Sequence, residues 1–409
     1  MSGMAALSTV WRRLAPEPVR RLAQPLISPL LEAHVRRQAR AAHGADGQAG
    51  GPLKIVGYFS ASHGIGASAR LAARAFEALG APVERVEAAG AALTWRPAGP
   101  APGPASAWIF HLNAPELLAM LGHMGPQRLV GPRYAYWAWE LPKAPPLWLK
   151  DAALVDEVWA PSRYVARALT GARAPVRVVP HPLFLEDYAQ VRPRPREAAF
   201  EALTLFDFNS SAARKNPLGA LEAFARAFGN EAGARLTVKT QNGARHPQAL
   251  ADLQAAAAAI GPRVRLIDET WDYEAVKALI AGADVLISLH RAEGFGLTPA
   301  EALALGTPVL ATAGSGPADF LDDTVALLVP GRAVPVEDAQ GIYRGQTWSE
   351  PDLEAAALAL RALRDQPALR ETLARAGRRR AAERLSPQAW FTTLPDAVKQ
   401  AALRAARAG

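Results

Sequence analysis

Short apolar runs alternate with helix-like stretches along most of the chain, and this alternation restricts the fold more than any other feature of the sequence. The first run, LKIVGYF at residues 53–59, is typical of a strand, and a helical pattern over 68–80 follows it and ends at Gly80. Strands that alternate with helices predict parallel sheets, so we expect an α/β fold. The other expected strands are 81–88, 106–114, 133–140, 155–162, 202–208, 234–240, 263–269, 284–290 and 307–312, and the other expected helices are 216–229, 274–283 and 298–306.

The chain is long enough for two domains. Its 409 residues exceed what one hydrophobic core usually serves, and half of them are hydrophobic. The proline-rich segment 191–199 (VRPRPREAA) is the best linker between the halves. We therefore expect two doubly wound, Rossmann-like domains, 51–190 and 191–385, that face each other across a cleft. Ligands of such sheets bind beyond the carboxyl ends of the strands.

Residues 1–50 read as a separate basic extension that ends in a glycine-rich linker. Seven arginines are interleaved with apolar side chains such as Trp11, Leu26 and Leu31, a composition that suits an anionic membrane surface. The four prolines between residues 16 and 29 are expected to break any long amphipathic helix. The alternative is a loosely ordered segment that touches the first domain.

Composition excludes several classes of function. The chain has no cysteine, and its eight histidines show no pair at metal-ligand spacing, so thiol chemistry and a zinc site are not expected. The net charge of +8 suits an anionic partner, yet no basic run is interleaved with aromatics, so we expect no nucleic-acid binding. No apolar run reaches the length of a membrane span. We expect a cytoplasmic protein, with peripheral binding to the inner face of the cytoplasmic membrane left open by residues 1–50.

The segment HRAEGFGLTPAEALALGTPV, residues 290–309, carries the clearest functional signal. A strand ends at His290 and a helix follows the EGFG turn, for which Thr298 is the expected N-cap and Gly306 the expected C-terminal cap. Backbone N–H groups at a helix N-terminus favour an anion, commonly a phosphate. Glycines at 294 and 296 would let a ligand approach the backbone closely.

Two carboxylates flank this turn. Glu301 stands three residues after Thr298, which fits a capping box. Glu293 has no such local role, and an unpaired carboxylate there would repel a phosphate but could accept hydrogen bonds from hydroxyls. A ligand with both phosphates and hydroxyls is a nucleotide-sugar.

These residues resemble a known family. SLHRAEGFGLTPAEALALGTPVLAT is similar to the glutamate–seven–glutamate motif of the family 4 retaining glycosyltransferases of GT-B architecture, and the resemblance extends over most of residues 54–385. It implies that Glu293 contacts the hydroxyls of the donor sugar and that the amides after it, at Phe295, Gly296 and Leu297 with Thr298, meet the diphosphate or sugar. It also implies that Glu301 holds the ribose, a role that competes with the capping box. A closing helix over about 387–407 is expected to cross back onto the first domain.

The resemblance implies a cation for the diphosphate. Lys215, in SAARKNP, matches the family's lysine, and a lysine is conspicuous in a chain that otherwise uses arginine for most of its positive charge. The family's preceding Gly-Arg pair is replaced here by Phe206-Asp207. Arg214 is the candidate substitute, and a more weakly held diphosphate is the alternative.

Candidates in the first domain are less specific. Gly64 and Gly66, in SASHGIGASAR, fit a glycine loop that faces the donor phosphate, and they also fit the dinucleotide fingerprint of a nicotinamide-dependent oxidoreductase, with Glu84 or Glu87 as its acidic residue. The resemblance places a catalytic histidine near His111 and Asn113. Acceptor-side candidates are His63, Trp139 and Glu140, although core packing explains Trp137 and Trp139 equally well.

The sequence therefore predicts a retaining glycosyltransferase that uses a nucleotide-diphosphate sugar and a glycan or lipid-linked glycan acceptor. No Asp-x-Asp metal motif is present, and the resemblance implies neither an essential metal nor a cofactor. The alternatives are a sugar phosphorylase, a non-catalytic carbohydrate- or nucleotide-binding relative, and the oxidoreductase.

Overall fold

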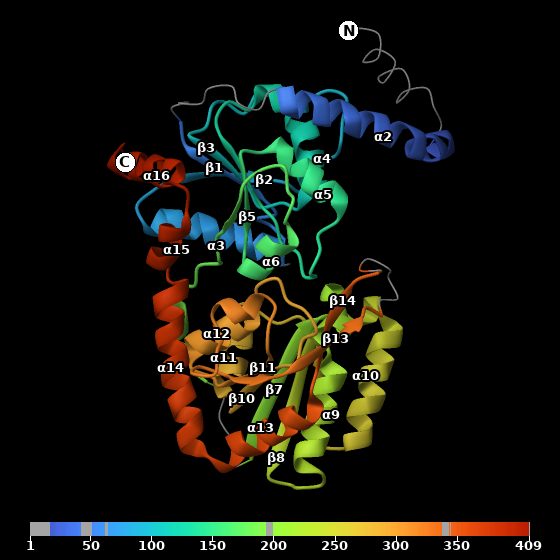
Figure 1. Cartoon of the computed structure of the whole chain (residues 1–409), viewed down its shortest axis with the longest axis vertical. Helices are drawn as coiled ribbons and strands as arrows, with labels where there is room; N and C mark the ends of the chain where they lie inside the picture. The colour runs from blue at the N-terminus through green and yellow to red at the C-terminus, as the bar shows by residue number, and fades with distance from the viewer. Residues whose placement is uncertain are drawn as a thin grey trace.

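The computed structural model describes residues 17–41, 51–61, 64–193, 199–337, 343 and 345–408. Two α/β domains are stacked along the long axis of the molecule (Figure 1). His63 and Trp11 lie outside the described residues, as do 194–198 of the expected linker.

The first domain is built on a six-stranded parallel sheet of order β2-β1-β3-β4-β5-β6. Five of its strands match the apolar runs of the sequence, whereas the short edge strand β6 was not predicted. Its strands are β1 (Leu53–Gly57), β2 (Val83–Glu87), β3 (Ala107–Phe110), β4 (Arg133–Tyr136), β5 (Glu157–Ala160) and β6 (Val176–Val178). Its helices are α2 (Glu17–Ala41), α3 (Gly64–Ala78), α4 (Ala114–Met124), α5 (Pro146–Asp151), α6 (Arg163–Ala168) and α7 (Glu186–Ala189).

The second domain repeats this plan with the order β12-β11-β10-β7-β8-β9, again with parallel pairing. An antiparallel hairpin, which the sequence analysis missed, follows the sheet. The strands are β7 (Phe200–Asp207), β8 (Ala234–Gln241), β9 (Val264–Asp268), β10 (Val285–Ser288), β11 (Val309–Thr312) and β12 (Leu327–Val329), with β13 (Gly331–Pro335) and β14 (Thr347–Pro351) in the hairpin. The helices are α8 (Ala212–Lys215), α9 (Pro217–Phe228), α10 (Pro247–Ile260), α11 (Tyr273–Gly282), α12 (Leu297–Leu305), α13 (Leu353–Asp365) and α14 (Pro367–Leu385).

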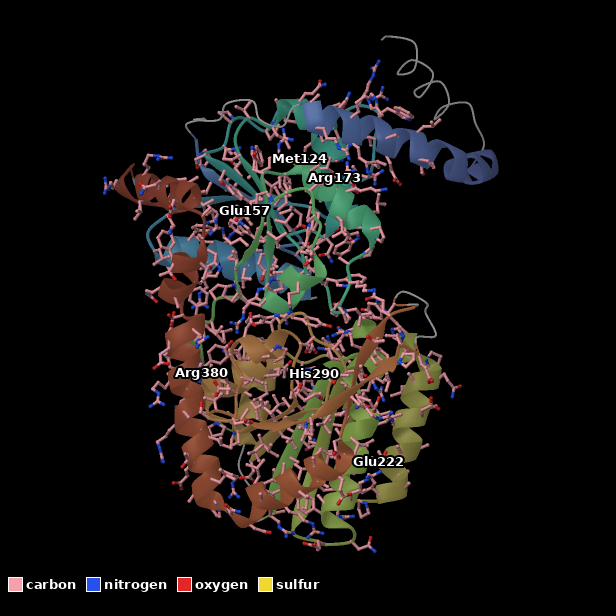
Figure 2. The ribbon with its side chains drawn as sticks, viewed as in Figure 1. Met124, Glu157, Arg173, Glu222, His290 and Arg380 are labelled. Carbon is pink, nitrogen blue, oxygen red and sulfur yellow. The ribbon has the colours of Figure 1, made fainter. Side chains whose placement is uncertain are left out.

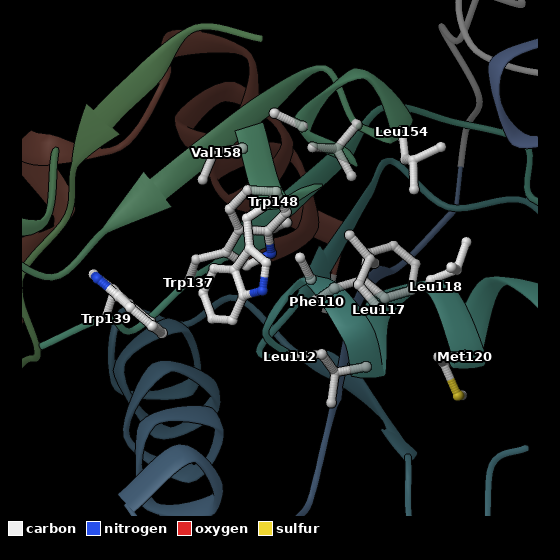
Figure 3. Close-up of a cluster of buried hydrophobic side chains, with 14 of the residues drawn as sticks. Phe110, Leu112, Leu117, Leu118, Met120, Trp137, Trp139, Trp148, Leu154 and Val158 are labelled. Carbon is white, nitrogen blue, oxygen red and sulfur yellow. The ribbon is translucent and has the colours of Figure 1, made fainter. Parts of the chain in front are cut away.

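Each sheet is covered by apolar side chains on both faces, as expected for parallel sheets. In the first domain, one face carries a cluster rich in aromatic rings, including Trp137 and Trp148 at a centroid distance of 5.8 Å (Figure 3). These cores hold the carboxyl ends of the strands in fixed positions, and the candidate site residues follow those ends.

The N-terminal helix corrects one expectation. Helix α2 continues through Pro25 and Pro29, so the prediction that the prolines would break it is wrong. After Pro29 the helix is anchored, because Leu31, Val35 and Ala39 are spaced four residues apart and all are buried against the first domain. The free energy gained by burying this apolar stripe offsets the loss of the backbone hydrogen bonds that the prolines remove. Leu31 is therefore a core residue, not a lipid contact.

The chain ends on the first domain (Figure 1). Two helices, α15 (Pro387–Thr393) and α16 (Asp396–Ala408), occupy the range predicted for one. The break falls at Leu394, because a residue that precedes a proline disfavours the helical conformation. Trp390 packs edge-on against Phe76 of α3 at 5.0 Å, within an apolar cluster of the first domain.

Candidate active site between the two domains

A charged cluster lies where β7 and β10 end. The two strands are neighbours in the second sheet, so the segments that follow them meet at one edge. Lys215 of α8 donates from Nζ to Oε1 of Glu293, and Nη1 of Arg214 lies 3.2 Å from Oε2 of the same carboxylate. Glu293 is therefore a paired carboxylate: two cations that are distant from it in sequence neutralise its charge.

The two cations differ in exposure. Arg214 is 4% exposed, and its guanidinium donates to the carbonyl oxygens of Ala292 and Ser210, both at 2.9 Å. The Lys215 side chain keeps 23% of its surface exposed. Arg214 is thus enclosed by protein, whereas the ammonium group of Lys215 remains accessible to a ligand.

These charges control the protonation of Glu293. Burial by itself would raise the pKa of Glu293, but the charges of Lys215 and Arg214 outweigh it and lower this pKa to about 2. Burial by itself would lower the pKa of Arg214, yet Glu293 and Glu140 raise it above its ordinary value. The carboxylate is therefore ionised at neutral pH.

The turn after Glu293 is held by contacts that explain its glycines. A Cβ atom on Gly294 would lie 2.7 Å from the carbonyl oxygen of Trp139 in the first domain, and Gly296 has a φ of 92°. The carbonyl oxygen of Gly294 accepts a 2.6 Å hydrogen bond from Oγ of Ser162, also in the first domain. Gly294 thus permits close approach of the backbone of the first domain. The sequence analysis had instead suggested close approach of a ligand.

Ser315 supports the same turn from the second domain. Its Oγ accepts from the Glu293 backbone N–H at 3.2 Å and lies 3.1 Å from Nε2 of His290. Figure 2 labels His290 in the part of the second domain that lies toward the first. His290 is 2% exposed, and burial lowers its pKa to about 4, so its ring is uncharged at neutral pH.

Helix α12 begins two residues earlier than the expected N-cap at Thr298 implies. Leu297 is its first residue, Gly296 is its N-cap, and no side chain caps the helix, so Thr298 is not the N-cap. Gly306 does end the helix, in the left-handed conformation. Phe295 is buried and packs edge-on against His181 at 4.8 Å.

Glu301 is bonded elsewhere than in a capping box. Its Oε1 accepts a 2.6 Å hydrogen bond from the hydroxyl of Tyr273, which lies 2.9 Å from the hydroxyl of Tyr188. Burial raises the pKa of Glu301 to about 7, although the Tyr273 hydrogen bond opposes this rise. The capping-box explanation is therefore wrong.

The first domain contributes His111 and Asn113 from the end of β3. His111 is buried, its Nδ1 lies 2.8 Å from Oγ of Ser68, and its Nε2 has no hydrogen-bond partner among the described residues. Burial lowers the pKa of His111 to about 3, so the ring is neutral. Asn113 accepts a 2.9 Å hydrogen bond from the backbone N–H of Ala138, which joins the ends of β3 and β4.

The glycine loop is partly described. Gly66 is needed for close packing, because a Cβ atom there would lie 2.5 Å from the carbonyl oxygen of Tyr58. Gly64 is exposed at the start of α3, with open space around it. Of the acidic residues that the dinucleotide fingerprint requires, Glu84 is paired with Lys54 at 2.9 Å, and Glu87 accepts from the N–H groups of Ser60 and Ala89.

Trp139 and Glu140 lie beside the cluster on the first domain. The Trp139 ring is 6% exposed and packs edge-on against Trp148 and Tyr343, so it is a core residue, and Trp137 is fully buried. Glu140 is partly exposed, and its Oε1 lies 3.9 Å from Nη2 of Arg214. Of the two acceptor-side candidates within the described residues, Trp139 and Glu140, the side chain of Glu140 lies against the charged cluster.

Several residues that position this site were not predicted. Ser162 and Tyr273 gave no signal in the sequence, because their roles depend on contacts across domains or between neighbouring loops. Tyr343 and Gln346 belong to the hairpin region and bond the segment 139–143 of the first domain, with Tyr343 donating to Glu140 at 3.3 Å and Gln346 donating to the Lys143 carbonyl at 2.9 Å. Only Ser315, between two glycines in AGSG, stood in a pattern that could have drawn attention.

The fold and this site define a GT-B glycosyltransferase architecture: two doubly wound domains that meet at the carboxyl ends of their parallel strands. A profile described as family 4 glycosyltransferase in conflict systems matches residues 161–385, which is more than half of the chain. The protein belongs to this family of glycosyltransferases. No curated protein sequence matches the chain significantly.

Solved structures are similar in fold. HepE of Anabaena, in complex with UDP and glucose, has a TM-score of 0.61 at 13% identity and covers 85% of this chain and 99% of its own. A sucrose-phosphate synthase from Thermosynechococcus elongatus has a TM-score of 0.61 at 18% identity over 86% of this chain and 98% of its own. A glycosyltransferase from Rickettsia africae has a TM-score of 0.61 at 14% identity and covers 83% of this chain and 95% of its own. At these identities the likeness establishes the fold.

Proposed function

We propose that the protein transfers a sugar from a uridine-diphosphate sugar to a hydroxyl of an acceptor glycan or lipid-linked glycan, with retention of the anomeric configuration. The observation that carries the proposal is the Lys215–Glu293–Arg214 cluster beside the first turn of α12. It offers a cation for a diphosphate and a carboxylate for sugar hydroxyls within one site. The UDP and glucose in the similar HepE structure support the choice of donor.

The unequal exposure of the two cations suggests how the donor is bound. A diphosphate carries more charge than a carboxylate and competes with Glu293 for Lys215. Arg214, enclosed by backbone carbonyls, stays with Glu293 and keeps it ionised. Glu293 then has lone pairs free for the sugar hydroxyls, while Lys215 and the α12 N–H groups stabilise the charge on the departing diphosphate. The acceptor hydroxyl oxygen bonds to the anomeric carbon as the bond from that carbon to the phosphate oxygen breaks, and the leaving phosphate takes the acceptor's proton on the same face. This step, with retention, follows from the family resemblance.

Glu301 is assigned to the ribose. Its carboxylate already accepts one hydroxyl, from Tyr273, in a half-buried setting. A ribose hydroxyl offers the same chemistry, so the Tyr273 contact shows that the position suits a hydroxyl donor. In Glu301→Gln, uridine affinity should fall about tenfold, the scale of a hydrogen bond to a charged group.

The proposal is tested by incubating the protein with UDP-sugars and following UDP release together with the anomeric NMR signal of the product. Release of UDP with an α-configured product from an α-configured donor is the expected result. Turnover that requires inorganic phosphate in place of a nucleotide would favour a phosphorylase, and UDP binding without turnover of any donor would favour a non-catalytic relative.

Peripheral membrane binding remains a proposal for the N-terminal helix. Arg37 and Arg40 are exposed on α2, and Leu30 is 66% exposed. No helix of the described residues is long and apolar enough to cross a bilayer. Sedimentation with anionic vesicles at low and high salt, using the whole chain and an Arg37→Glu/Arg40→Glu variant, tests the proposal. Equal sedimentation of the two proteins would contradict it.

A further inference from the structure

A pocket lies in the first domain, apart from the charged cluster. It has a volume of about 210 Å³ and opens where three neighbouring strands end. Tyr58 directly follows β1, Ala88 directly follows β2, and Glu116 and Met120 lie on α4, which follows β3. We call it the α4 pocket. The pocket is linked to the candidate site in sequence, because the site residue Asn113 directly precedes α4.

The walls of the α4 pocket are mainly apolar. Ala88 and Ala91 line it from the loop after β2, and Pro115 and Met120 line it from α4. Met120 is 2% exposed and belongs to the apolar cluster of the domain; Figure 3 shows its side chain at the margin of that cluster. Such walls favour a ligand that presents a flat apolar face.

Two polar residues line the same pocket, Tyr58 and Glu116. Burial raises the pKa of Tyr58, and the charges of Glu116 and Glu87 raise it further, so the phenol remains a neutral donor near two carboxylates. Glu87 is held in place by the backbone N–H groups of Ser60 and Ala89. The charge of Glu116 in the lining attracts hydroxyl hydrogens and repels phosphates and carboxylates.

Apolar walls with a carboxylate and a phenol are the complement of a sugar ring, which has one face of C–H groups and a rim of hydroxyls. We propose that the α4 pocket binds the acceptor, and that it selects an uncharged, hydroxylated ring over its phosphorylated form. Glu116 accepts acceptor hydroxyls and excludes anionic groups. This inference rests on the proposed glycosyl transfer and adds the class of acceptor to it.

Glu116 also has a purely structural explanation. It lies in the first turn of α4, where a carboxylate stabilises the positive end of the helix dipole. That role alone would give a variant with a lower melting temperature and unchanged ligand affinity. The test must therefore measure binding as well as stability.

The whole chain is titrated with phenyl β-glucoside and with phenyl β-glucoside 6-phosphate, which differ only in the phosphate, by calorimetry in the presence of UDP. We expect wild type to bind the uncharged glucoside about tenfold or more tightly than the phosphate. Glu116→Gln should weaken binding of the glucoside about tenfold and reduce the preference against the phosphate. Ala91→Phe, which fills the pocket, should abolish glucoside binding.

Ala89→Phe is the matched control, because Ala89 is exposed in the same loop and does not line the pocket. UDP affinity should be unchanged in all three variants. Equal affinity of wild type and Glu116→Gln for the glucoside, tighter binding of the phosphate, or equal effects of Ala89→Phe and Ala91→Phe would overturn the inference. If wild type binds the glucoside but not UDP, the pocket stands as a sugar site and the proposed donor fails.

Discussion

Lys215 and Glu293 are 78 residues apart in sequence and form an ion pair through Nζ and Oε1. Both were predicted to bind the donor, but as separate contacts to diphosphate and sugar. Their pairing means that each is preorganised by the other, and that a diphosphate must displace Glu293 from Lys215. The consequences can be measured.

Lys215→Ala should weaken binding of UDP about tenfold or more and leave binding of uridine nearly unchanged. The lysine is assigned to the phosphates, and a hydrogen bond to a charged group contributes about 1.5–3 kcal/mol. Calorimetric titration with both ligands measures the two affinities. Lys150→Ala, in α5 of the first domain, is the control. Equal losses for UDP and uridine would show that the assignment to the phosphates is wrong.

Glu293→Gln should reduce turnover about a hundredfold, which corresponds to roughly 2.7 kcal/mol of transition-state stabilisation. UDP affinity should not fall, because Lys215 remains and no longer has to leave a carboxylate. Steady-state kinetics with a UDP-sugar gives both values. Glu157→Gln is the matched control, since Glu157 is also buried and paired with an arginine, Arg177, but lies at the amino end of β5. Wild-type turnover in Glu293→Gln would exclude its catalytic role.

The stability of the ligand-free protein should carry a pH dependence that Glu301→Gln removes. Burial raises the pKa of Glu301 from 4.5 to about 7, so the folded state holds a proton that the unfolded state has lost. The contribution of Glu301 therefore favours folding at low pH and is lost as the pH rises from about 4.5 to about 7. Urea unfolding across this range should show the difference in unfolding free energy between wild type and Glu301→Gln decreasing with pH.

Comparing the two proteins cancels the buried histidines His111, His181 and His290, whose lowered pKa values change stability in the opposite direction in both. Tyr273→Phe provides a second check. This substitution removes the hydrogen bond that opposes the rise in the pKa of Glu301. The loss of stability that accompanies deprotonation of Glu301 should therefore extend to higher pH. A difference between wild type and Glu301→Gln that does not vary with pH would contradict the environment described for Glu301.

Ser162→Ala should destabilise the protein by about 1–3 kcal/mol more than Ser386→Ala does. Both serines cap helices, α6 and α15, but only Ser162 also donates to the carbonyl oxygen of Gly294 in the other domain. Removal leaves a buried carbonyl without its donor. Chemical unfolding of the two variants measures the difference. Equal destabilisation would mean that the bond to Gly294 contributes nothing to the contact between the domains.

Arg36→Ala should lower the free energy of unfolding by about 2–3 kcal/mol, the scale of leaving a buried charge unpaired. Arg36 donates to both carboxylate oxygens of Asp151, at 2.7 and 3.0 Å, and the Asp151 side chain is 2% exposed. Arg37→Ala is the control, because Arg37 is exposed on the same helix. Thermal melting of both variants tests whether α2 is part of the first domain's fold. No difference between them would show that it is not.

The sequence by itself determined the local structure around the site. Alternating apolar runs predicted ten of the strand positions, and the EGFG segment predicted a turn between a strand and a helix that ends at Gly306. Local patterns suffice there, because strand and helix periodicity and glycine conformations depend on residues close in sequence. The position of the N-cap was predicted wrongly because residue preferences point to Thr298. The left-handed conformation of Gly296, which is the N-cap in the structure, cannot be read from residue preferences as readily.

Only the tertiary structure decided which charges meet. The pairing of Glu293 with Lys215 and Arg214 depends on β7 and β10 being neighbours, and strand order is not encoded in periodicity. The bond from Ser162 to Gly294 depends on how the two domains dock, and the packing of Leu31, Val35 and Ala39 depends on a surface formed by distant segments. The sequence determined what each residue could do chemically. The fold determined the partners, because contacts between residues far apart in the chain exist only once the sheets are assembled.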